Sequence, residues 1–354
     1  MSSTPEMSVI ICSRNGADGI GRALRSLAAQ TIAERLEVVV VDDGSHDGTG
    51  DVAERHGARV VRHGVNRGLA AARNSGIDAS SGPVIAFLDD DCEADARWAE
   101  EILRAYDDDA VAAVGGVVVP GPGDGFVLGY LRRHNPLEPL EIELARSERP
   151  LYRLRLYLRR QWTAHERPVR RDVFSLVGAS MSLRREVLEG LGRFDERFTF
   201  GAEELDVFYR VGRAMPERRI VLDTRAVVTH HFSPSLRDTL RRSRAYGRGA
   251  ARFRAKWPTV GPTIFPAPLV EAALIGLAGR SRLAALAAVL LPHAVLPAGV
   301  RAAVRARSAV PLADAYVAIV QEALGNLGFA EGMRRYRHLA PERDVPAAAT
   351  PAAA

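Results

Sequence analysis

Three consecutive aspartates follow an apolar run in the segment VIAFLDDDCE, residues 84–93. Adjacent carboxylates repel one another, so a compensating positive charge is expected wherever they lie together. Mg²⁺ and Mn²⁺ bind to a few carboxylates together with the oxygens of substrate phosphates. The D-x-D spacing of Asp89 and Asp91 therefore indicates a metal site that holds a diphosphate, although an acidic loop after a strand explains the same residues.

Two further segments contain polar residues that could bind a nucleotide. Asp42 and Asp43 end the apolar part of VVVVDDGSHDGTGDVA, residues 38–53. A carboxylate there can accept a hydrogen bond from an imide N–H, which uracil has and cytosine lacks. A strand followed by a turn and a capped helix is the structural alternative. Arg73 lies midway along an expected helix and either faces the nucleotide or is an ordinary surface arginine.

Later in the chain, an acidic pair and a histidine pair could act as a base and as ligands. Glu203 and Glu204 precede a helical pattern, where the helix dipole alone favours negative side chains. His230 and His231 follow an apolar run and are metal or phosphate ligands or simply polar loop residues. A buried carboxylate in the acidic pair could serve as a general base, because burial raises its pKa.

The elements that must position these residues form a regular alternation. Short β-branched runs at 8–12, 37–41, 58–62 and 84–88 predict strands, and 17–30, 47–56 and 68–79 predict helices. Such alternation predicts a mostly parallel sheet with helices around it. Ligands of these sheets bind beyond the carboxyl ends of the strands. The polar residues after three of the runs, at 13–15, 42–45 and 89–91, are therefore expected on one edge.

Four blocks in this order, MSVIICSRNG, VVVVDDGSHDGT, NRGLAAARNSGI and FLDDDC, resemble the family 2 glycosyltransferases of the GT-A fold. The block GASMSLRREVLEGLGRFDERFTFGAEELDVFYR looks like the acceptor side of that family. VVTHHFSPS and YGRG are similar to its later elements. The resemblance covers about residues 1–250 and implies an α/β, Rossmann-like GT-A sheet flanked by helices, with a carboxyl-terminal helical extension.

The resemblance also implies roles for individual residues. It places the nucleotide at Cys12 (through its backbone), Ser13, Asp43, Arg73 and Asp89, and it makes Asp91 and His230 the metal ligands. Glu204 is the expected base and Glu203 the alternative, although the family more often has Glu followed by Asp there. Residues expected near the acceptor or the phosphates are Ser180, Asp206, His231, Arg244 and Arg248. Ser180 stands where the family often has Asn.

Composition bounds the location and the partners. The formal charge is +5, and the cations are arginines except for Lys256. Arginine dominates residues 237–256, where it could neutralise a diphosphate or contact anionic lipid headgroups. Two cysteines without a signal peptide favour a reducing compartment. We expect a cytoplasmic protein associated with the inner face of the cell membrane, and nucleic acid is not an expected partner.

The chain is expected to divide into four parts. These are a nucleotide-sugar half (1–115), an acceptor half (116–255), a helical and possibly membrane-associated region (256–340) and a disordered tail (341–354). Residues 283–300 have no formal charge, but they contain two prolines and many alanines. An interfacial or buried helical hairpin is therefore favoured over a spanning helix, which needs about 20 strongly apolar residues.

The expected function is that of a metal-dependent inverting glycosyltransferase of the hexosyltransferase type. It would use Mn²⁺ or Mg²⁺ and move a sugar from a nucleotide diphosphate donor, with UDP favoured. The acceptor would be a hydroxyl of a lipid-linked, polysaccharide or other cell-envelope molecule. Alternatives are a nucleotidyltransferase that makes the activated sugar, although SRNGADGIGR (13–22) lacks its dense glycine loop, and a non-catalytic membrane-associated subunit.

Overall fold

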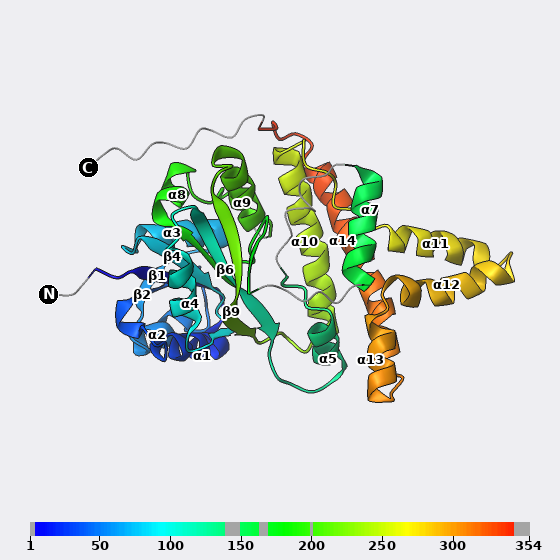
Figure 1. The fold of residues 1–354 in the computed structure, drawn as a ribbon, viewed down its shortest axis with the longest axis horizontal. Helices are drawn as coiled ribbons and strands as arrows, with labels where there is room; N and C mark the ends of the chain where they lie inside the picture. The colour runs from blue at the N-terminus through cyan, green and yellow to red at the C-terminus, as the bar shows by residue number, and fades with distance from the viewer. Residues whose placement is uncertain (1–3, 139–148, 163–168, 199–200, 343–354) are drawn as a thin grey trace.

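The computed structural model describes residues 4–138, 149–162, 169–198 and 201–342. It shows an α/β domain with a group of helices beside it (Figure 1). The strands are β1 (Met7–Ser13), β2 (Leu36–Asp42), β3 (Arg59–Arg62), β4 (Val84–Leu88), β5 (Cys92–Ala94), β6 (Val111–Pro120), β7 (Arg170–Asp172), β8 (Ser180–Arg184) and β9 (Arg219–His230). The helices are α1 (Ala17–Ala28), α2 (Thr49–Arg55), α3 (Leu69–Asp78), α4 (Trp98–Ala105), α5 (Phe126–Arg133), α7 (Pro150–Trp162), α8 (Arg185–Gly190), α9 (Glu203–Ala214), α10 (Leu236–Lys256), α11 (Ala267–Ala278), α12 (Arg282–Val295), α13 (Ala298–Ala306) and α14 (Ala313–Tyr336), with short 3-10 turns at Ala33–Arg35 and Val310–Leu312.

The described strands form one nine-stranded sheet in the order β3-β2-β1-β4-β8-β6-β9-β5, with β7 paired to β9. β1 to β4 are parallel to one another, as the alternation of strands and helices predicts. β8 lies antiparallel between β4 and β6, and β5 and β7 are antiparallel to β9. The predicted α/β fold is therefore confirmed. The sheet is mixed: strands β1 to β4 pair in parallel with one another, and β6 pairs in parallel with β9.

Helices cover both faces of the sheet and create two apolar clusters. Side chains of a strand alternate between faces, so Val9 and Ile11 of β1 pack with α1 and α4, whereas Ile10 packs with α3, α8 and α9. Helix α1 buries residues at the spacing of one helical face, namely Ile20, Ala23, Leu24 and Leu27. The periodic patterns thus decide which side of each element enters the core.

The carboxyl ends of the parallel strands meet on one edge. The backbone N–H of Asp43 donates to the carbonyl oxygen of Ser13 at 2.9 Å, which joins the end of β2 to the end of β1. The hydroxyl of Ser13 donates to the carboxylate of Asp90, which follows β4. His230 at the end of β9 pairs with Cys92 of β5. The predicted convergence of three strand ends is confirmed, and β9 contributes a fourth.

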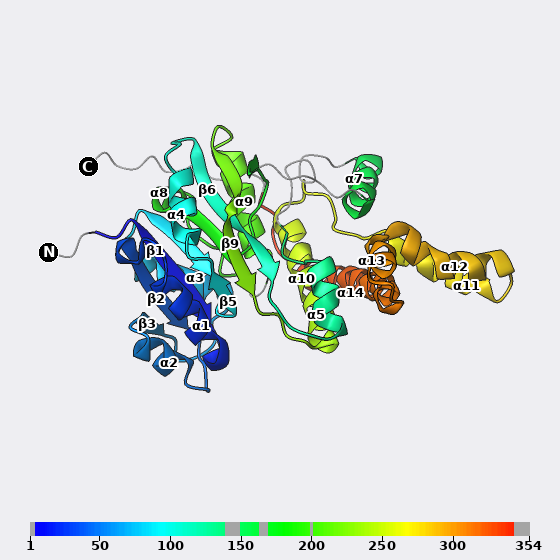
Figure 2. The same cartoon turned by 60° about the horizontal axis from the view of Figure 1, so that its bottom comes forward.

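Helix α10 packs against α14 so closely that glycine is required at the contact. A Cβ atom added at Gly247 would lie 2.1 Å from the carbonyl oxygen of Gly325, and one added at Gly328 would lie 2.0 Å from that of Arg244. The two helices run side by side in Figures 1 and 2. The carboxyl-terminal helices are thereby anchored on α10. The boundary expected between residues 115 and 116 falls inside β6, and that between 255 and 256 falls at the end of α10.

The carboxyl-terminal helices are apolar but short. Among the described residues, no single helix has both the length and the apolar character needed to cross a membrane. Helices α12 and α13 meet both requirements only when taken together, and the chain bends by 82° between them. The tail expected to be disordered, residues 341–354, lies outside the described residues from 343 onward.

Candidate functional site

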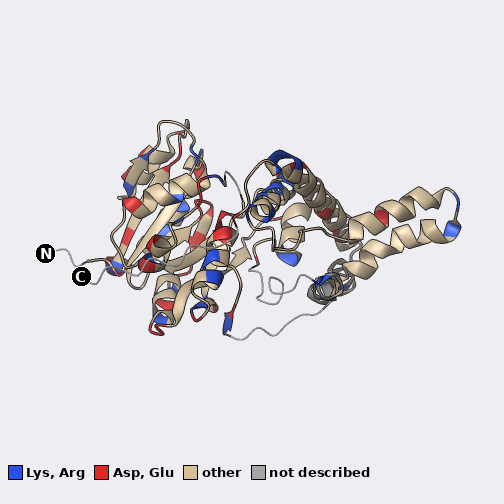
Figure 3. Ribbon diagram, turned by 90° about the horizontal axis from the view of Figure 1, so that it is seen from above, with Lys and Arg blue, Asp and Glu red and all other residues tan. Residues whose placement is uncertain are grey.

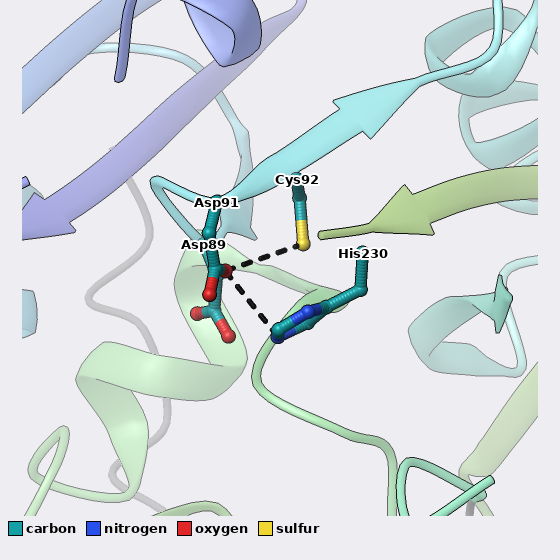
Figure 4. A group of neighbouring side chains, drawn as sticks. All are labelled: Asp89, Asp91, Cys92 and His230. Carbon is teal, nitrogen blue, oxygen red and sulfur yellow. Dashed lines mark hydrogen bonds and ion pairs between the residues drawn. The ribbon is translucent and has the colours of Figure 1, made fainter. Parts of the chain in front are cut away.

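The loop between β4 and β5 and the end of β9 form a cluster of potential metal ligands (Figure 4). Asp89, Asp91, Cys92 and His230 each offer one ligand atom, and these atoms all lie within 4.8 Å of one another. The Nε2 atom of His230 lies 3.3 Å from Oδ1 of Asp91. Its Nδ1 atom is buried and has no hydrogen-bond partner among the described residues. Buried polar atoms normally have partners, so this cluster fits a bound cation.

Burial and mutual repulsion disfavour the ionised form of the three aspartates. Burial, followed by the charges of the neighbouring aspartates, raises the pKa of Asp91 to about 7. Burial also raises the pKa of Asp90 to about 6 and that of Asp89 above its usual value. Burial lowers the pKa of His230 to about 3, so its imidazole is neutral and can be a ligand. A divalent cation would remove the repulsion and favour the ionised carboxylates.

Cys92 is less suited to a cation than its neighbours. It is fully buried and packs in the apolar cluster beneath α1 and α4. Burial, and then the charge of Asp89, raises the pKa of its thiol well above the ordinary value. Because the thiolate is the form that binds metals, the effective ligands are two carboxylates and one imidazole. Cys12, at the end of β1, also keeps a neutral thiol, since burial raises its pKa to about 12.

The turn between β1 and α1 lies directly against Asp90. A Cβ atom at Gly16 would lie 2.1 Å from Oδ2 of Asp90 and 2.3 Å from the hydroxyl of Ser13, so a larger residue would displace one of these side chains. Gly19 also approaches the backbone of Asp90, with its Cβ position 3.0 Å from the carbonyl oxygen. Asp90, which the sequence analysis left without a role, thus fastens the acidic loop to β1.

Asp43 lies on the predicted edge, but its carboxylate also has partners inside the protein. Oδ1 accepts from the backbone N–H of Arg67 at 2.8 Å and pairs with Nδ1 of His63 at 2.7 Å. Oδ2 accepts from the backbone N–H of Gly68 at 2.9 Å. These bonds hold the segment that leads into α3. Because each carboxylate oxygen has two lone pairs, a further bond to a nucleotide base stays a prediction.

Arg73 is buried, so the interpretation of a surface arginine is wrong. Its Nη1 atom donates to Oε1 of Glu203 at 2.8 Å, and both side chains are 3% exposed. The guanidinium lies 5.5 Å and 5.3 Å from the ring centres of Phe87 and Phe194. Although burial lowers the pKa of Arg73, the charge of Glu203 and of other nearby acids, among them Asp89, raises it. Arg73 therefore connects α3 to the start of α9.

Glu204 follows Glu203 on α9, and its carboxyl group is outside that ion pair. Its Oε2 atom is buried without a hydrogen-bond partner among the described residues. Burial, followed by the negative charge of Glu203, raises the pKa of Glu204 to about 8. Ala202, which precedes the helix, has a φ of 68° in the left-handed region, a conformation that non-glycine residues adopt when their surroundings require it. Glu204 is thus held as a carboxyl group of high proton affinity.

Arg242, rather than Arg244 or Arg248, is the arginine of α10 that acts on the acidic loop. Burial raises the pKa values of the three aspartates, and the positive charge of Arg242 opposes that shift. Arg244 and Arg248 instead pair with Glu331 of α14. The expectation that these two neutralise a diphosphate stays a prediction. Arg244 and Arg248 are four residues apart, so they share the face of α10 that meets α14. Arg242 is two residues before Arg244 and therefore lies on a different face of the helix.

Ser180 and Asp206 are both buried and have partners inside the protein. Ser180 is fully buried, and its hydroxyl accepts from Nε1 of Trp98 at 3.0 Å and from the backbone of Gly116 at 3.2 Å. Asp206 is also fully buried and lies 2.8 Å from Nζ of Lys256. Both side chains have partners inside the protein, and their expected contact with acceptor or phosphate stays a prediction.

His231, the alternative ligand, lies beside a different acid. Its Nε2 atom is 2.9 Å from Oε1 of Glu93, and Glu93 lies 3.6 Å from Arg22 of α1. Its backbone N–H donates to the carbonyl oxygen of Asp91 at 2.9 Å. His230 therefore faces the acidic cluster, whereas His231 connects the loop to α1.

Curated proteins with similar sequences are glycosyltransferases by name. The pre-mycofactocin glycosyltransferase of Mycobacterium tuberculosis is 29% identical over 257 residues, which cover 72% of this chain and 48% of that protein. Two proteins of Haloferax volcanii, the glycosyltransferase AglE and a glucosyl-dolichyl phosphate glucuronosyltransferase, are each 37% identical over 123 residues, about a third of this chain and 40% and 39% of those proteins. The chain spans less than half the length of these relatives.

Solved structures and a family match complete the comparison. The mannosyltransferase PcManGT from Pyrobaculum calidifontis, in complex with GDP-Man and Mn²⁺, superimposes with a TM-score of 0.56 at 20% identity over 93% of this chain and 87% of that chain. GalNAc-T7 with UDP, GalNAc and Mn²⁺ gives 0.51 at 18% identity over 73% and 49%. At such low identity the likeness shows the fold alone, and it confirms the predicted GT-A fold.

The family described as Glycosyl transferase family 2 matches residues 8–192, more than half of the chain. The chain therefore belongs to glycosyl transferase family 2.

Proposed function

We propose that this protein is a metal-dependent inverting glycosyltransferase. It transfers a sugar from a nucleoside diphosphate donor, with UDP favoured, to a hydroxyl group of a lipid-linked, polysaccharide or other cell-envelope acceptor. The observation that carries the proposal is the cluster of potential metal ligands around Asp91 and His230 at the edge of the sheet. Arg73, whose charge acts on Asp89, pairs with Glu203 at the start of α9. A relative named for a dolichyl phosphate substrate supports the lipid-linked class of acceptor.

Asp89, Asp91 and His230 are the residues that would hold the cation. Two carboxylates with an imidazole suit Mn²⁺, since Mg²⁺ strongly prefers oxygen ligands. Both similar structures are complexes with Mn²⁺, which supports the same choice. When bound, the cation neutralises charge that develops on the leaving diphosphate. Arg242 adds a fixed positive charge beside the same acidic loop.

Glu204 is the proposed general base. Its carboxylate takes the proton of the acceptor hydroxyl while that oxygen forms a bond to the anomeric carbon. The bond between the anomeric carbon and the diphosphate oxygen breaks, and its electron pair leaves with the nucleoside diphosphate. Attack from the side opposite the leaving group inverts the anomeric configuration. Glu203 is less suited, because its Oε1 atom is already paired with Nη1 of Arg73 at 2.8 Å.

The ends of β1 and β2 are the proposed nucleotide site. Cys12, through its backbone, together with Ser13 and Asp43, is proposed to receive the base, and Asp89 the ribose. The support is their common place on the edge that also holds the acidic loop. Arg73 is a positioning residue in this scheme, since its bond to Glu203 fixes the start of α9 relative to α3.

Release of nucleoside diphosphate tests the proposal. The purified chain is incubated with UDP-sugars and GDP-sugars, with Mn²⁺, with Mg²⁺ and with EDTA. We expect release that requires the cation, that EDTA abolishes and that Asp91→Asn lowers by about 10²-fold or more, as for loss of a group that stabilises developing charge. Asp109→Asn is the matched control, because that side chain is fully exposed and far along the chain from the cluster.

Two results would contradict the assignment. If the folded protein shows no cation-dependent release from these donors, and no cation-dependent rise in melting temperature with UDP or GDP, the site is not a donor site. If nucleoside triphosphate and sugar phosphate instead yield pyrophosphate, the protein is a nucleotidyltransferase.

A further inference from the structure

Helices α11 and α12 form an antiparallel hairpin that projects away from the α/β domain (Figures 1 and 2). Residues 279–281 make the turn at its tip. The base of the hairpin is tied to α14, because the hydroxyl of Tyr316 donates to the carbonyl oxygen of Val289 at 3.0 Å. Pro292, nearer the end of α12, interrupts the hydrogen bonding of that helix. The hairpin is thus an attached, ordered element.

The outward surface of the hairpin lacks the polar face of a soluble helix. On α11, the buried positions Ala267 and Glu271 lie on one side, and exposed apolar residues occupy the remaining sides. The exposed large side chains of both helices are Leu269, Val270, Ile275, Leu277, Leu283, Leu286, Val289 and Leu290. A helix that is apolar all around is normally covered by a protein core or by lipid. This hairpin therefore requires an apolar environment on several sides.

The charges near the hairpin have one sign. Between Glu271 and Asp314 the sequence contains no acidic residue and five arginines, all of them exposed. They are Arg280, Arg282, Arg301, Arg305 and Arg307. Figure 3 shows basic residues at the tip of the hairpin, at the end farthest from the α/β domain. Each such residue contributes about 1 kcal/mol to binding near an anionic lipid surface.

We propose that the α11–α12 hairpin inserts into one leaflet of an anionic lipid bilayer, with the five arginines in the headgroup layer. The helices have 12 and 14 residues, so they are about 18 and 21 Å long at 1.5 Å per residue, shorter than the hydrocarbon core of about 30 Å. An oblique position brings the tip arginines and those of α13 to the headgroups while the leucines enter the acyl region. This inference concerns attachment and does not depend on the proposed sugar transfer.

A second copy of the chain is a poorer partner for the same surface. A two-fold contact would cover one side of the hairpin, but the exposed residues of α11 lie on several sides of the helix. Each copy would also bring its five arginines to the contact, where like charges repel. A bilayer surrounds the inserted element and supplies the opposite charge.

Vesicle flotation tests the proposal. The full chain is mixed with vesicles of phosphatidylcholine, with and without phosphatidylglycerol. We expect it to float with the anionic vesicles, and we expect Leu283→Glu to lower its partition coefficient about tenfold or more, since burial of a leucine contributes about 1.5–3 kcal/mol. Leu283 is 79% exposed, so the variant should fold. Val65→Glu is the matched control, because Val65 is 70% exposed in the α/β domain, and it should bind as the unmodified chain does.

The tip arginines give an independent measurement. The double variant Arg280→Gln, Arg282→Gln should bind anionic vesicles roughly fivefold more weakly per arginine, in line with about 1 kcal/mol each. Arg55→Gln, an exposed arginine of α2, is the control. Full vesicle binding by Leu283→Glu, or no flotation of the unmodified chain, would overturn the proposal. So would a dimer in light scattering that Leu283→Glu dissociates while vesicles have no effect.

Donor turnover separates this inference from the proposed function. The Leu283→Glu variant should keep cation-dependent release of nucleoside diphosphate from a soluble donor, because the hairpin lies outside the acidic cluster. Asp91→Asn should lose that release and still float with anionic vesicles. If Asp91→Asn floats but no variant or unmodified chain releases nucleotide, attachment stands and the sugar-transfer proposal fails.

Discussion

Between residues 4 and 138, one large apolar side chain, Val65, is exposed, whereas sixteen are exposed between residues 264 and 339. The first region hides its apolar residues in two clusters on either side of a sheet and gathers charged residues at one edge. The second region exposes its apolar residues and places arginines at the ends of its helices. This contrast indicates that chemistry and attachment are carried by separate parts of one chain. Changes in one part should therefore leave the function of the other intact.

The largest effect is expected from Glu204→Gln. An amide cannot take the proton of the acceptor, so sugar transfer should fall by about 10²- to 10⁴-fold, whereas vesicle binding should not change. Transfer to an acceptor and vesicle flotation are measured on the same preparation. Glu217→Gln is the matched control, since Glu217 is exposed beyond the end of α9. Full transfer by Glu204→Gln together with loss of transfer by Glu203→Gln would exchange the two assignments.

The next effect concerns the junction between the two regions. Lys256 at the end of α10 is buried and lies 2.9 Å from Asp195, 2.8 Å from Asp206 and 3.6 Å from Glu342. Lys256→Met removes one cation of this cluster, while Arg210 still pairs with Asp206 and Arg197 with Asp195. The free energy of unfolding should fall by about 1.5–3 kcal/mol, the contribution of hydrogen bonds to charged groups. Urea unfolding can be followed by tryptophan fluorescence, because Nε1 of Trp257 donates to Asp206.

Arg197→Met is the control for that measurement. Arg197 pairs with the same acids, Asp195 and Glu342, but its side chain is 57% exposed. Exposed pairs contribute at most about 1 kcal/mol. If Lys256→Met lowers the free energy of unfolding no more than Arg197→Met does, the junction between the two regions does not depend on the buried lysine.

Sequence patterns were sufficient for the sheet edge because the necessary information is local. The β-branched runs at 8–12, 37–41 and 84–88 each end in polar residues, and parallel pairing places those ends together. The pairing of Arg73 with Glu203 could not be predicted, since the two residues are 130 positions apart and meet only when α9 packs on the sheet. The full burial of Asp206 and Ser180 could not be predicted either, because a polar residue type does not reveal burial.

In the helical region as well, the sequence predicts the elements but not their tertiary contacts. Composition at 283–300 favoured a buried or interfacial hairpin over a spanning helix, and no single helix of the described residues is long and apolar enough to cross a membrane. Which arginine of α10 faces the site depended on a tertiary feature, the glycine contact of Gly247 and Gly328 with the neighbouring helix. That contact turns Arg244 toward α14 and leaves Arg242 on the other side, so a run of arginines alone was not sufficient.

A smaller effect is expected in the pH dependence of stability. Burial raises the pKa of Glu204 from 4.5 to about 8 in the folded protein, so the folded state holds this proton more tightly than the unfolded chain. Stability therefore falls as pH rises from about 4.5 to about 8 and then levels off. Glu204→Gln lacks this group and should gain stability relative to the unmodified chain over that range, by about 1 kcal/mol or more.

Unfolding at several pH values measures that difference. Glu203 on the same helix and Arg73 on α3 are the charged neighbours, and their ion pair is present in both proteins. Glu217→Gln serves again as the control and should track the unmodified chain at every pH. A difference that shrinks as pH rises would mean that Glu204 is ionised more easily in the folded state than in the unfolded one, contrary to its buried setting.

The smallest effect separates two neighbouring arginines of α10. Arg242→Ala removes a positive charge that acts on the acidic loop, so the affinity for Mn²⁺ alone should rise a few-fold and the affinity for UDP with Mn²⁺ should fall a few-fold, on the order of 1 kcal/mol each. Arg244→Ala should change neither, because Arg244 pairs with Glu331 at the exposed contact with α14. Calorimetric titration of both variants measures these affinities. Equal effects of the two substitutions would mean that both arginines act only through the net charge of α10. The packing of α10 against α14 would then not decide which arginine acts on the acidic loop.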